Sequence, residues 1–378
     1  MKIAGIVCEF NPFHHGHKYL IDKIKNDYKM DLVIAAMSPN FVMRGEPAIF
    51  NKFERTYHAL LNRVDLVAEI PTVYAIESAD IFAYRSIEIL NNLGITDLFF
   101  GVEVDDASTF DRIIEISESK KYLENIKKYL EKGDSFNAAS KKSIIEIDPQ
   151  TSIILSSPNN LLAIEYLKSI KTINNKIIPH FIKRVSTFYY DSLKEGTIIQ
   201  SGTAIRELIK ENKEYKNFVP YETKRVVYNV NNTLFELIKY KIISSSCEEI
   251  ANIKGVTEGL ENKIKSIKEF TTYENLIAEL VSKRNRETKI KRILMYILLG
   301  IKKCEVSSSS LKYIRILGFS SAGQKYLSFF NNENIKIYTS LKKSPFEALS
   351  NELTYTKIYS MLTHEDIIEK EYLPIRLS

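Results

Sequence analysis

The sequence predicts an α/β protein in which a doubly wound parallel sheet in residues 1–215 is followed by a mainly α-helical domain in residues 216–378. Short apolar runs alternate with segments that have helical spacing, and this alternation predicts parallel strands covered by helices. Beyond about residue 215 the helical spacing continues, while strand-like runs become rare. The chain is long enough for each domain to have its own core.

Five apolar runs are predicted as strands: residues 3–8, 32–37, 66–71, 98–102 and 177–182. Residues 81–93 have helical spacing, and the lysine-rich residues 105–148 are interpreted as a mostly helical surface insertion. Pro47 is well placed to begin another helix. Ligands of such sheets bind beyond the carboxyl ends of the strands. The residues that follow the predicted strands there include His14, His17, Ser38, Asn40, Glu69, Gly101 and Glu103.

The loop after the first strand, residues 10–17 (FNPFHHGH), contains three of the six histidines in the chain. It connects an apolar run to a segment with helical spacing. A loop of this kind directs backbone N–H groups and the positive end of a helix dipole toward one point, which suits a phosphate. The clustered histidines therefore predict a phosphate-binding site.

Residues 157–160 (SPNN) begin another predicted helix. Ser157 can cap this helix, with Pro158 at its first position, but capping does not explain the adjacent pair Asn159 and Asn160.

The loop and one further motif together resemble the signature pair of HxGH-type nucleotidyltransferases, which implies a Rossmann-like fold. The pair consists of His14-x-Gly16-His17 and Ser201-x-Thr203-x-x-Arg206, and the second motif is predicted to open another helix. Attack at the α-phosphate of ATP builds negative charge on its oxygens, so the site needs positioned donors rather than a covalent nucleophile.

The roles follow from this chemistry. We predict that His14, His17 and Arg206 are catalytic, and that Ser201 and Thr203 bind the β- and γ-phosphates. A metal site formed by two histidines is the alternative, but neither cysteine nor an HExxH arrangement accompanies them, and we predict no metal site.

Composition limits the class of protein. The net charge is +6 and the pI about 8.8, which permits an acidic partner such as RNA without requiring one. No apolar run is long enough to span a membrane, and the first residues lack a secretory signal pattern. Cys8, Cys247 and Cys304 show no metal or disulfide spacing, which favours a reducing cytoplasm.

Further motifs appear in order along the chain: residues 8–17 (CEFNPFHHGH), 37–38 (MS), 44–47 (RGEP), 79–83 (ADIFA), 99–101 (FFG), 157–160 (SPNN) and, more loosely, 315–319 (RILGF). The set is similar to the bacterial tRNA(Met) cytidine acetate ligase family. The resemblance implies that acetate and ATP form acetyladenylate, whose acetyl group passes to N4 of the wobble cytidine of elongator tRNA(Met). Pro39 and Met43 depart from the glycine and glutamine expected there.

The resemblance also implies which residues contact ATP: Val7, Cys8, Glu9, Phe10, Asn11, Pro12, Phe13, Gly16, Leu20, Gly101, Asn159 and Arg184. Mg²⁺ is expected with ATP on general grounds. Acetate is a small anion that needs only one or two donors, and Arg44 and Asn40 are candidates by position.

A basic run is the predicted tRNA-binding element. Residues 283–292 contain one acidic residue, Glu287, and six basic residues: Lys283, Arg284, Arg286, Lys289, Lys291 and Arg292. These side chains could bind RNA phosphates, or they could form an ordinary solvated helix face. The buried face of the same helix is predicted at Ile290, Ile293, Leu294 and Ile297.

Two other functions remain open. One is an adenylyltransferase that acts on a small phosphorylated acceptor, with the helical domain serving only in oligomerisation. The other is an RNA-binding protein that has kept the fold and lost the chemistry. The presence of His14, His17 and Arg206 argues against the second, and the size of the helical domain argues against the first.

Overall fold

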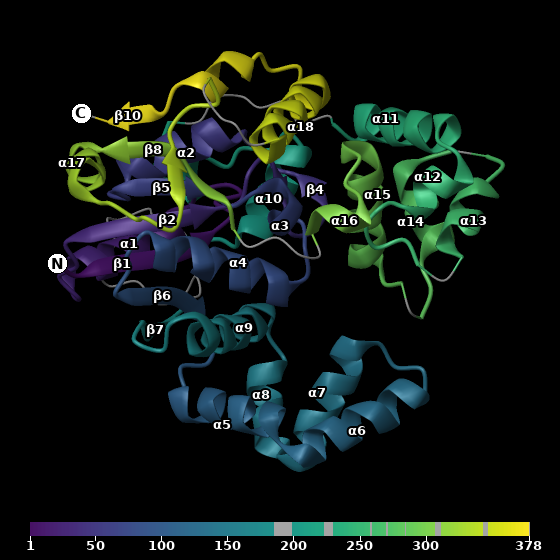
Figure 1. Ribbon diagram of the computed structural model, residues 1–378, viewed down its shortest axis with the longest axis horizontal. Coiled ribbons are helices and arrows are strands. Elements are labelled where there is room, and N and C mark those ends of the chain that lie inside the picture. The colour runs from purple at the N-terminus through teal and green to yellow at the C-terminus, as the bar shows by residue number, and fades with distance from the viewer. Residues whose placement is uncertain are drawn as a thin grey trace.

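The computed structural model describes residues 1–184, 199–222, 230–257, 259–269, 271–283, 285–306, 311–342 and 347–377. Within these ranges the core is an eight-stranded sheet in the spatial order β10-β8-β5-β2-β1-β6-β7, with β9 paired to β8 (Figure 1). The strands are β1 (Ile3–Cys8), β2 (Leu32–Met37), β5 (Leu66–Glu69), β6 (Asp97–Val102), β7 (Ile178–Lys183), β8 (Tyr313–Ser320), β9 (Lys336–Tyr338) and β10 (Ile375–Leu377).

The five predicted strands are consecutive in this sheet and pair with one another in parallel. β1 pairs with β2 and β6, β2 pairs with β5, and β6 pairs with β7, all in parallel. β2 therefore lies on one side of β1 and β6 on the other, so the order of the strands reverses at β1. The crevice beyond the carboxyl ends of β1 and β6 is the usual ligand position in such a sheet.

Most predicted helices are also present. They are α1 (His15–Asn26), α4 (Ala79–Asn92), α9 (Pro158–Ile173) and α10 (Gly202–Lys210). The lysine-rich insertion is helical as predicted, and with the short α8 it projects from one end of the molecule (Figure 1). The insertion consists of α5 (Ala107–Glu118), α6 (Lys120–Glu131) and α7 (Phe136–Ile147), and α8 (Ser152–Leu155) follows it.

The prediction that Pro47 begins a helix is wrong. β3 (Phe41–Val42) and β4 (Glu46–Pro47) form a hairpin instead, and the next helix, α2 (Lys52–Leu61), begins five residues later, behind its N-cap Asn51. Gly45 makes the tight turn possible because its φ of 74° suits a residue without Cβ. Another short helix, α3 (Thr72–Ala75), follows β5.

The expectation that residues 216–378 are nearly all helical is wrong for three segments. β8, β9 and β10 belong to the sheet of the first part, and β8 lies antiparallel beside β5. Seven of the eight residues of β8 are buried, which explains its continuous apolar run. Its partner β5 is about 250 residues earlier in the chain, and a pairing over that separation leaves no periodic signal in the sequence.

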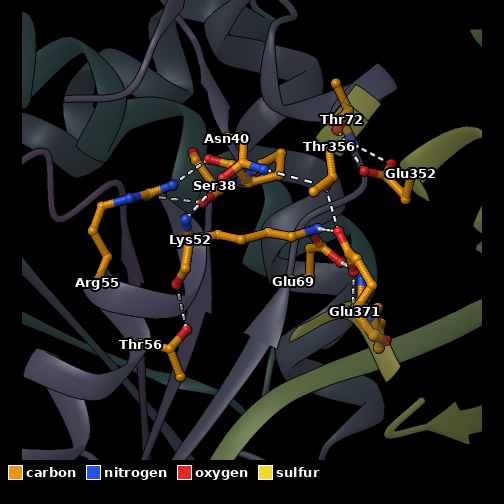
Figure 2. Close-up of polar contacts among 12 residues, drawn as sticks. Ser38, Asn40, Lys52, Arg55, Thr56, Glu69, Thr72, Glu352, Thr356 and Glu371 are labelled. Atoms are coloured by element: carbon orange, nitrogen blue, oxygen red, sulfur yellow. Dashed lines mark hydrogen bonds and ion pairs between the residues drawn. The ribbon is translucent and has the colours of Figure 1, made fainter. Parts of the chain in front are cut away.

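A buried ion network joins this C-terminal part to the sheet (Figure 2). Lys52 Nζ lies 2.5 Å from Glu69 Oε1 and 2.9 Å from Glu371 Oε1, and all three side chains are at most 2% exposed. Arg315 on β8 also pairs with both carboxylates. Two cations thus face two anions, which is the balance that buried charges require.

Two further contacts extend the network. Glu352, on α18 (Glu347–Thr363), accepts hydrogen bonds from the backbone N and the hydroxyl of Thr72 at 2.7 and 2.6 Å. Thr356, one turn later, donates to Glu371 and accepts from Asn40 Nδ2 (Figure 2). The C-terminal helix α18 is therefore fixed to the loops after β2 and β5. Between β8 and α18 lies α17 (Ser321–Phe329).

The helical part lies beside the sheet and packs around α15 (Figure 1). The predicted buried face is confirmed, since Ile290, Ile293, Leu294 and Ile297 are each at most 2% exposed. Its helices are α11 (Asn231–Ser244), α12 (Cys247–Ala251), α13 (Leu260–Lys265), α14 (Tyr273–Leu280), α15 (Glu287–Leu299) and α16 (Lys303–Val306).

Candidate active site

A cavity of about 420 Å³ lies beyond the carboxyl ends of β1 and β6, where the strand order reverses. Its walls come from the loop after β1, the first turns of α1, α9 and α10, and the end of β7. Arg55 on α2 fixes this edge of the sheet. Its fully buried guanidinium donates to the backbone carbonyls of Glu9, Ser38 and Pro39.

His14 and His17 present hydrogen-bond donors to the cavity. Nδ1 of His14 accepts the N–H of Gly16 at 3.0 Å, and Nδ1 of His17 accepts the N–H of His14 at 3.2 Å. Because Nδ1 is an acceptor in both rings, the proton of each neutral ring is on Nε2. The two rings stack with centroids 3.8 Å apart, and both line the cavity.

Burial keeps both histidines neutral. It lowers the pKa of His14 to about 3, and the charges of Arg184, His15 and Arg206 add to the effect. Burial, His14 and Arg184 likewise hold the pKa of His17 well below its ordinary value. The imidazoles therefore act as neutral donors, and the positive charge of the site comes from the arginine and lysine side chains that line it: Arg44, Lys183, Arg184 and Arg206.

Arg206 connects the two halves of the motif pair. Its Nη1 donates to the carbonyl of Asn11 at 2.8 Å, and its Nη2 donates to Thr203 Oγ1 at 2.9 Å. Ser201 is the N-cap of α10 and accepts the N–H of Ala204 at 3.2 Å. The start of α10 thus meets the histidine loop across 195 residues of chain. Two helix N-termini and a fixed cation converge there, which suits a polyphosphate.

The opposite wall is formed by the end of β6 and the start of α9. Ser157 caps α9 and Pro158 is its first residue, as predicted. The Asn pair that capping left unexplained contacts Glu103: Asn160 Oδ1 accepts its backbone N–H at 3.0 Å, and Asn159 Nδ2 donates to its carboxylate. Gly101 lies beside Arg184, since a Cβ at position 101 would be 3.2 Å from Arg184 Cγ.

Residues 1–372 match the family model described as HIGH Nucleotidyl Transferase. The tRNA(Met) cytidine acetate ligase of Clostridium novyi is 37% identical over 385 residues, with 96% of each chain covered. That of Caldicellulosiruptor saccharolyticus is 40% identical over 361 residues, covering 90% of this chain and 88% of the relative. This chain belongs to the tRNA(Met) cytidine acetate ligase family. The predicted family is thereby confirmed.

The structural comparison agrees with this family. Thermotoga maritima TmcAL bound with alpha-thio ATP superposes with a TM-score of 0.86 at 28% identity, covering 100% of both chains. The apo form of the same protein gives a TM-score of 0.85. The predicted α/β nucleotidyltransferase fold is thereby confirmed, with the correction for β8, β9 and β10 given above.

Most residues that the motif pair and the family resemblance assign to the nucleotide site lie together. Those that line the cavity are Val7, Cys8, Glu9, Phe10, Asn11, His14, Gly16, His17, Leu20, Gly101, Asn159, Arg184, Ser201, Thr203 and Arg206. Pro12 and Phe13 are not among the described lining residues. Phe13 is fully buried and packs against Phe10 and His17, so it supports the loop from behind.

Sequence reasoning missed the apolar wall of the cavity. It consists of Tyr19, Phe82, Phe99, Phe100, Leu162, Tyr166, Ile182 and Ile199. These side chains belong to strands, helices and a loop whose patterns indicate only a core. Two signals were available: Phe82, Phe99 and Phe100 lie in the motifs at residues 79–83 and 99–101, and Leu162 lies within about one turn of the start of α9.

The two candidates for the acetate site differ. Arg44, in the turn of the β3–β4 hairpin, is exposed and lines the cavity. Asn40 is 2% exposed, and its amide oxygen accepts the N–H of Lys52 at 2.8 Å while its nitrogen donates to Thr356. Asn40 therefore belongs to the buried network, which contradicts its assignment to acetate.

The predicted basic run divides into two groups. Lys283 and Arg286 are exposed and Lys289 is partly exposed, whereas Arg284 lies outside the described residues. Lys291 forms an ion pair with Glu46 of the hairpin at 3.1 Å, and Arg292 donates to the carbonyl of Glu77 at 2.8 Å. Lys291 and Arg292 thus attach α15 to the catalytic part and are poorly placed to bind RNA.

Two absences concern the described part of the chain only. It contains no group of three or more His, Cys, Asp or Glu side chains arranged to hold a metal ion. Nor does it contain a helix with the length and apolar composition needed to cross a bilayer.

Proposed function

We propose that this protein is an ATP-dependent acetate ligase. It forms acetyladenylate from acetate and ATP, and transfers the acetyl group to N4 of the wobble cytidine of elongator tRNA(Met). The observation that supports this most directly is Arg206, which bonds to Asn11 of the histidine loop and to Thr203 of the second motif. That contact joins both motifs of an α-phosphate transfer site in one cavity.

In the first step, an acetate oxygen attacks the α-phosphorus and the bond to diphosphate breaks. Charge accumulates on the α-phosphate oxygens and on the departing diphosphate. The Nε2–H groups of His14 and His17 are neutral donors that suit the α-phosphate oxygens. Arg206, Ser201 and Thr203 suit the β- and γ-phosphates, because a guanidinium and a helix N-terminus both stabilise negative charge.

In the second step, N4 of cytidine attacks the acetyl carbonyl, AMP leaves and N4 loses a proton. The cytidine amine is a poor nucleophile because its lone pair is delocalised into the ring, so acetate has to be activated first. The base must leave its stack to enter the cavity, as anticodon-loop bases can. Arg44 at the exposed hairpin turn is a suitable cation for the acetate carboxylate.

We further propose that the tRNA-binding unit is the helical part, residues 230–306, with Lys283, Arg286 and Lys289 as its phosphate contacts. Mg²⁺ is expected to arrive with ATP and to be held mainly by the phosphates. Glu9 is the single carboxylate among the described lining residues, and its Oε1 already accepts the N–H of Met43 at 3.0 Å. Because tRNA is the acceptor, the reaction is expected in the cytoplasm.

The test is incubation of the purified protein with ATP, labelled acetate and unmodified tRNA. We expect label in N4-acetylcytidine of elongator tRNA(Met), with AMP and diphosphate released. Absence of label from every tRNA species would refute the proposal. The alternative, an adenylyltransferase with a small phosphorylated acceptor, predicts diphosphate exchange that does not require acetate, so acetate-dependent exchange separates the two.

A further inference from the structure

Glu103 contacts the nucleotide wall without being among the described lining residues of the cavity. It follows β6 directly, and its carboxylate accepts hydrogen bonds from Ser157 Oγ and from Asn159 Nδ2, one on each oxygen. Its backbone N–H donates to Asn160 Oδ1 at 3.0 Å. Both carboxylate oxygens are therefore occupied by the first turn of α9, and the carboxylate cannot rotate without losing a hydrogen bond.

These contacts determine which way the amide of Asn159 points. A carboxylate can only accept hydrogen bonds, so the side-chain NH₂ of Asn159 must face Glu103. The amide oxygen then points elsewhere, and Asn159 Oδ1 has no partner among the described residues. Asn159 itself lines the cavity. Asn159 therefore offers a ligand an acceptor, Oδ1, whose orientation is fixed by Glu103.

The neighbouring cation is held by the same carboxylate. Arg184 Nε lies 3.8 Å from Glu103 Oε1, and the charge of Arg184 is close enough to His14 and His17 to contribute to their lowered pKa values. Arg184 thus extends from Glu103 toward the phosphate end of the cavity. Glu103 thus contacts two residues that we assigned to ATP, Asn159 and Arg184.

We propose that Glu103 is a positioning residue that fixes the Asn159 amide so that its oxygen selects nucleotides carrying a hydrogen-bond donor on the nucleoside. The inference rests on the proposed function, in which ATP occupies this cavity. The triphosphate of ATP has no donor at neutral pH, so the partner of Asn159 Oδ1 is the 6-amino group of adenine or a ribose hydroxyl. Both candidate groups are hydrogen-bond donors, an N–H or an O–H, and either can bond to Asn159 Oδ1.

The experiment is calorimetric titration of the full chain with ATP, ITP, 2′-deoxy-ATP and 3′-deoxy-ATP, without acetate or tRNA. We expect the analogue that lacks the relevant donor to bind about tenfold more weakly than ATP, the usual effect of leaving one acceptor unpaired. ITP identifies the amino group and the deoxy analogues identify the hydroxyls. Equal affinity for all four nucleotides would overturn the proposal.

The decisive variant is Glu103→Gln. A glutamine amide can donate or accept, so Asn159 is no longer held in one orientation, and the tenfold ratio should fall to about threefold or less. Equal weakening of all four nucleotides would assign Glu103 a purely structural role, and an unchanged ratio would also contradict the inference. Asn159→Ala, at a partly exposed position, must lose the tenfold ratio as well. A retained ratio overturns the proposal even if Glu103→Gln fails to fold.

Glu118→Gln is the matched control, because Glu118 binds Lys171 near the other end of α9 and is 57% exposed. It should leave all four affinities unchanged, and a loss of the ratio in this variant would count against the proposal. Nucleotide titration needs neither acetate nor tRNA. Its outcome is therefore independent of whether the protein acetylates cytidine.

Discussion

Arg315 on β8 and Glu69 on β5 face each other across an antiparallel strand pair, with 2.9 Å between Nη1 and Oε2. Both side chains are at most 3% exposed. The pair joins the late strands of the chain to the early sheet, and each member also belongs to the network around Lys52 and Glu371.

Arg315→Met should destabilise the protein by about 3–5 kcal/mol, because it leaves two buried carboxylates with one cation. Denaturant unfolding measures the change. Lys171→Met, which removes an ion pair between side chains that are each 57% exposed, should cost less than about 1 kcal/mol. Equal effects of the two substitutions would contradict this account of the network.

Glu352→Gln should alter the pH dependence of stability. Burial, together with the charge of Glu69, raises the pKa of Glu352 from 4.5 to about 7. A carboxyl group with a raised folded-state pKa contributes stability that is complete below pH 4.5 and is lost as the pH rises through about 7. The variant lacks this loss, so its unfolding free energy relative to the parent should rise over that window by about 3 kcal/mol.

Unfolding curves of both proteins at several pH values test this directly. The pKa of Glu371 is lowered, because the charges of Lys52 and Arg315 outweigh the effect of its burial. Since Glu371 is present in both proteins, its contribution to the pH dependence cancels in the comparison. Parallel pH dependences for parent and variant would show that Glu352 does not titrate in this window.

His17→Ala should slow acetate-dependent diphosphate exchange by about 10²–10³-fold, the usual effect of losing one donor to a developing oxyanion. Binding of tRNA should change little. His15→Ala is the control, because His15 occupies the variable position of the motif and does not line the cavity among the described residues. Equal loss of exchange and of tRNA binding in His17→Ala would instead indicate a folding defect.

Charge reversal at Lys283, Arg286 and Lys289 together should weaken tRNA binding and flatten its dependence on salt. The log–log slope should fall by about 0.7–0.9 for each RNA phosphate that the protein no longer neutralises. The matched control is charge reversal at Lys120, Lys121 and Lys127, three lysines on the surface of α6. Binding measured over a range of salt concentrations separates the two triple variants. An unchanged slope would mean that the basic run is a solvated face.

Gly45→Ala should destabilise the packing of the β3–β4 hairpin against α15. Position 45 has a φ of 74°, and a Cβ there would lie 2.5 Å from the backbone N of Arg292. Gly133 has a φ of 86° with nothing within 4 Å of its Cβ position, so Gly133→Ala carries only the backbone cost of about 1 kcal/mol. Thermal unfolding of the two variants isolates the effect of packing. Equal decreases in the unfolding temperature would show that the hairpin accommodates the extra Cβ without loss of stability.

Local patterns in the sequence were sufficient for the parallel strands, the cap of α9 and the histidine loop. In each case the signal lies within a few residues, as with Ser157 and Pro158. Contacts between residues that are far apart in the chain could not be predicted from these patterns. The run from Tyr313 to Phe319 is visibly apolar, but nothing in it indicates that it pairs with β5, or that Arg315 has a buried partner at Glu69.

The candidate site divides in the same way. His14, His17 and Arg206 could be predicted because their residue types carry the chemistry. The apolar side chains of the wall look like ordinary core positions, and Lys291 and Arg292 look like their exposed neighbours. Which cations face solvent is decided by where the hairpin packs on α15, and that packing joins residues about 245 positions apart.

The position of β8 between β5 and β10 also determines when this sheet can be completed during synthesis. Until the ribosome has released residues 313–320, β5 is an open edge with unpaired backbone groups, a form that favours association between nascent chains. The helical part is made before that edge is covered. A gene cut at residue 215 would therefore encode an unfinished sheet with an exposed edge, and the two halves cannot be separated by a single break in the chain.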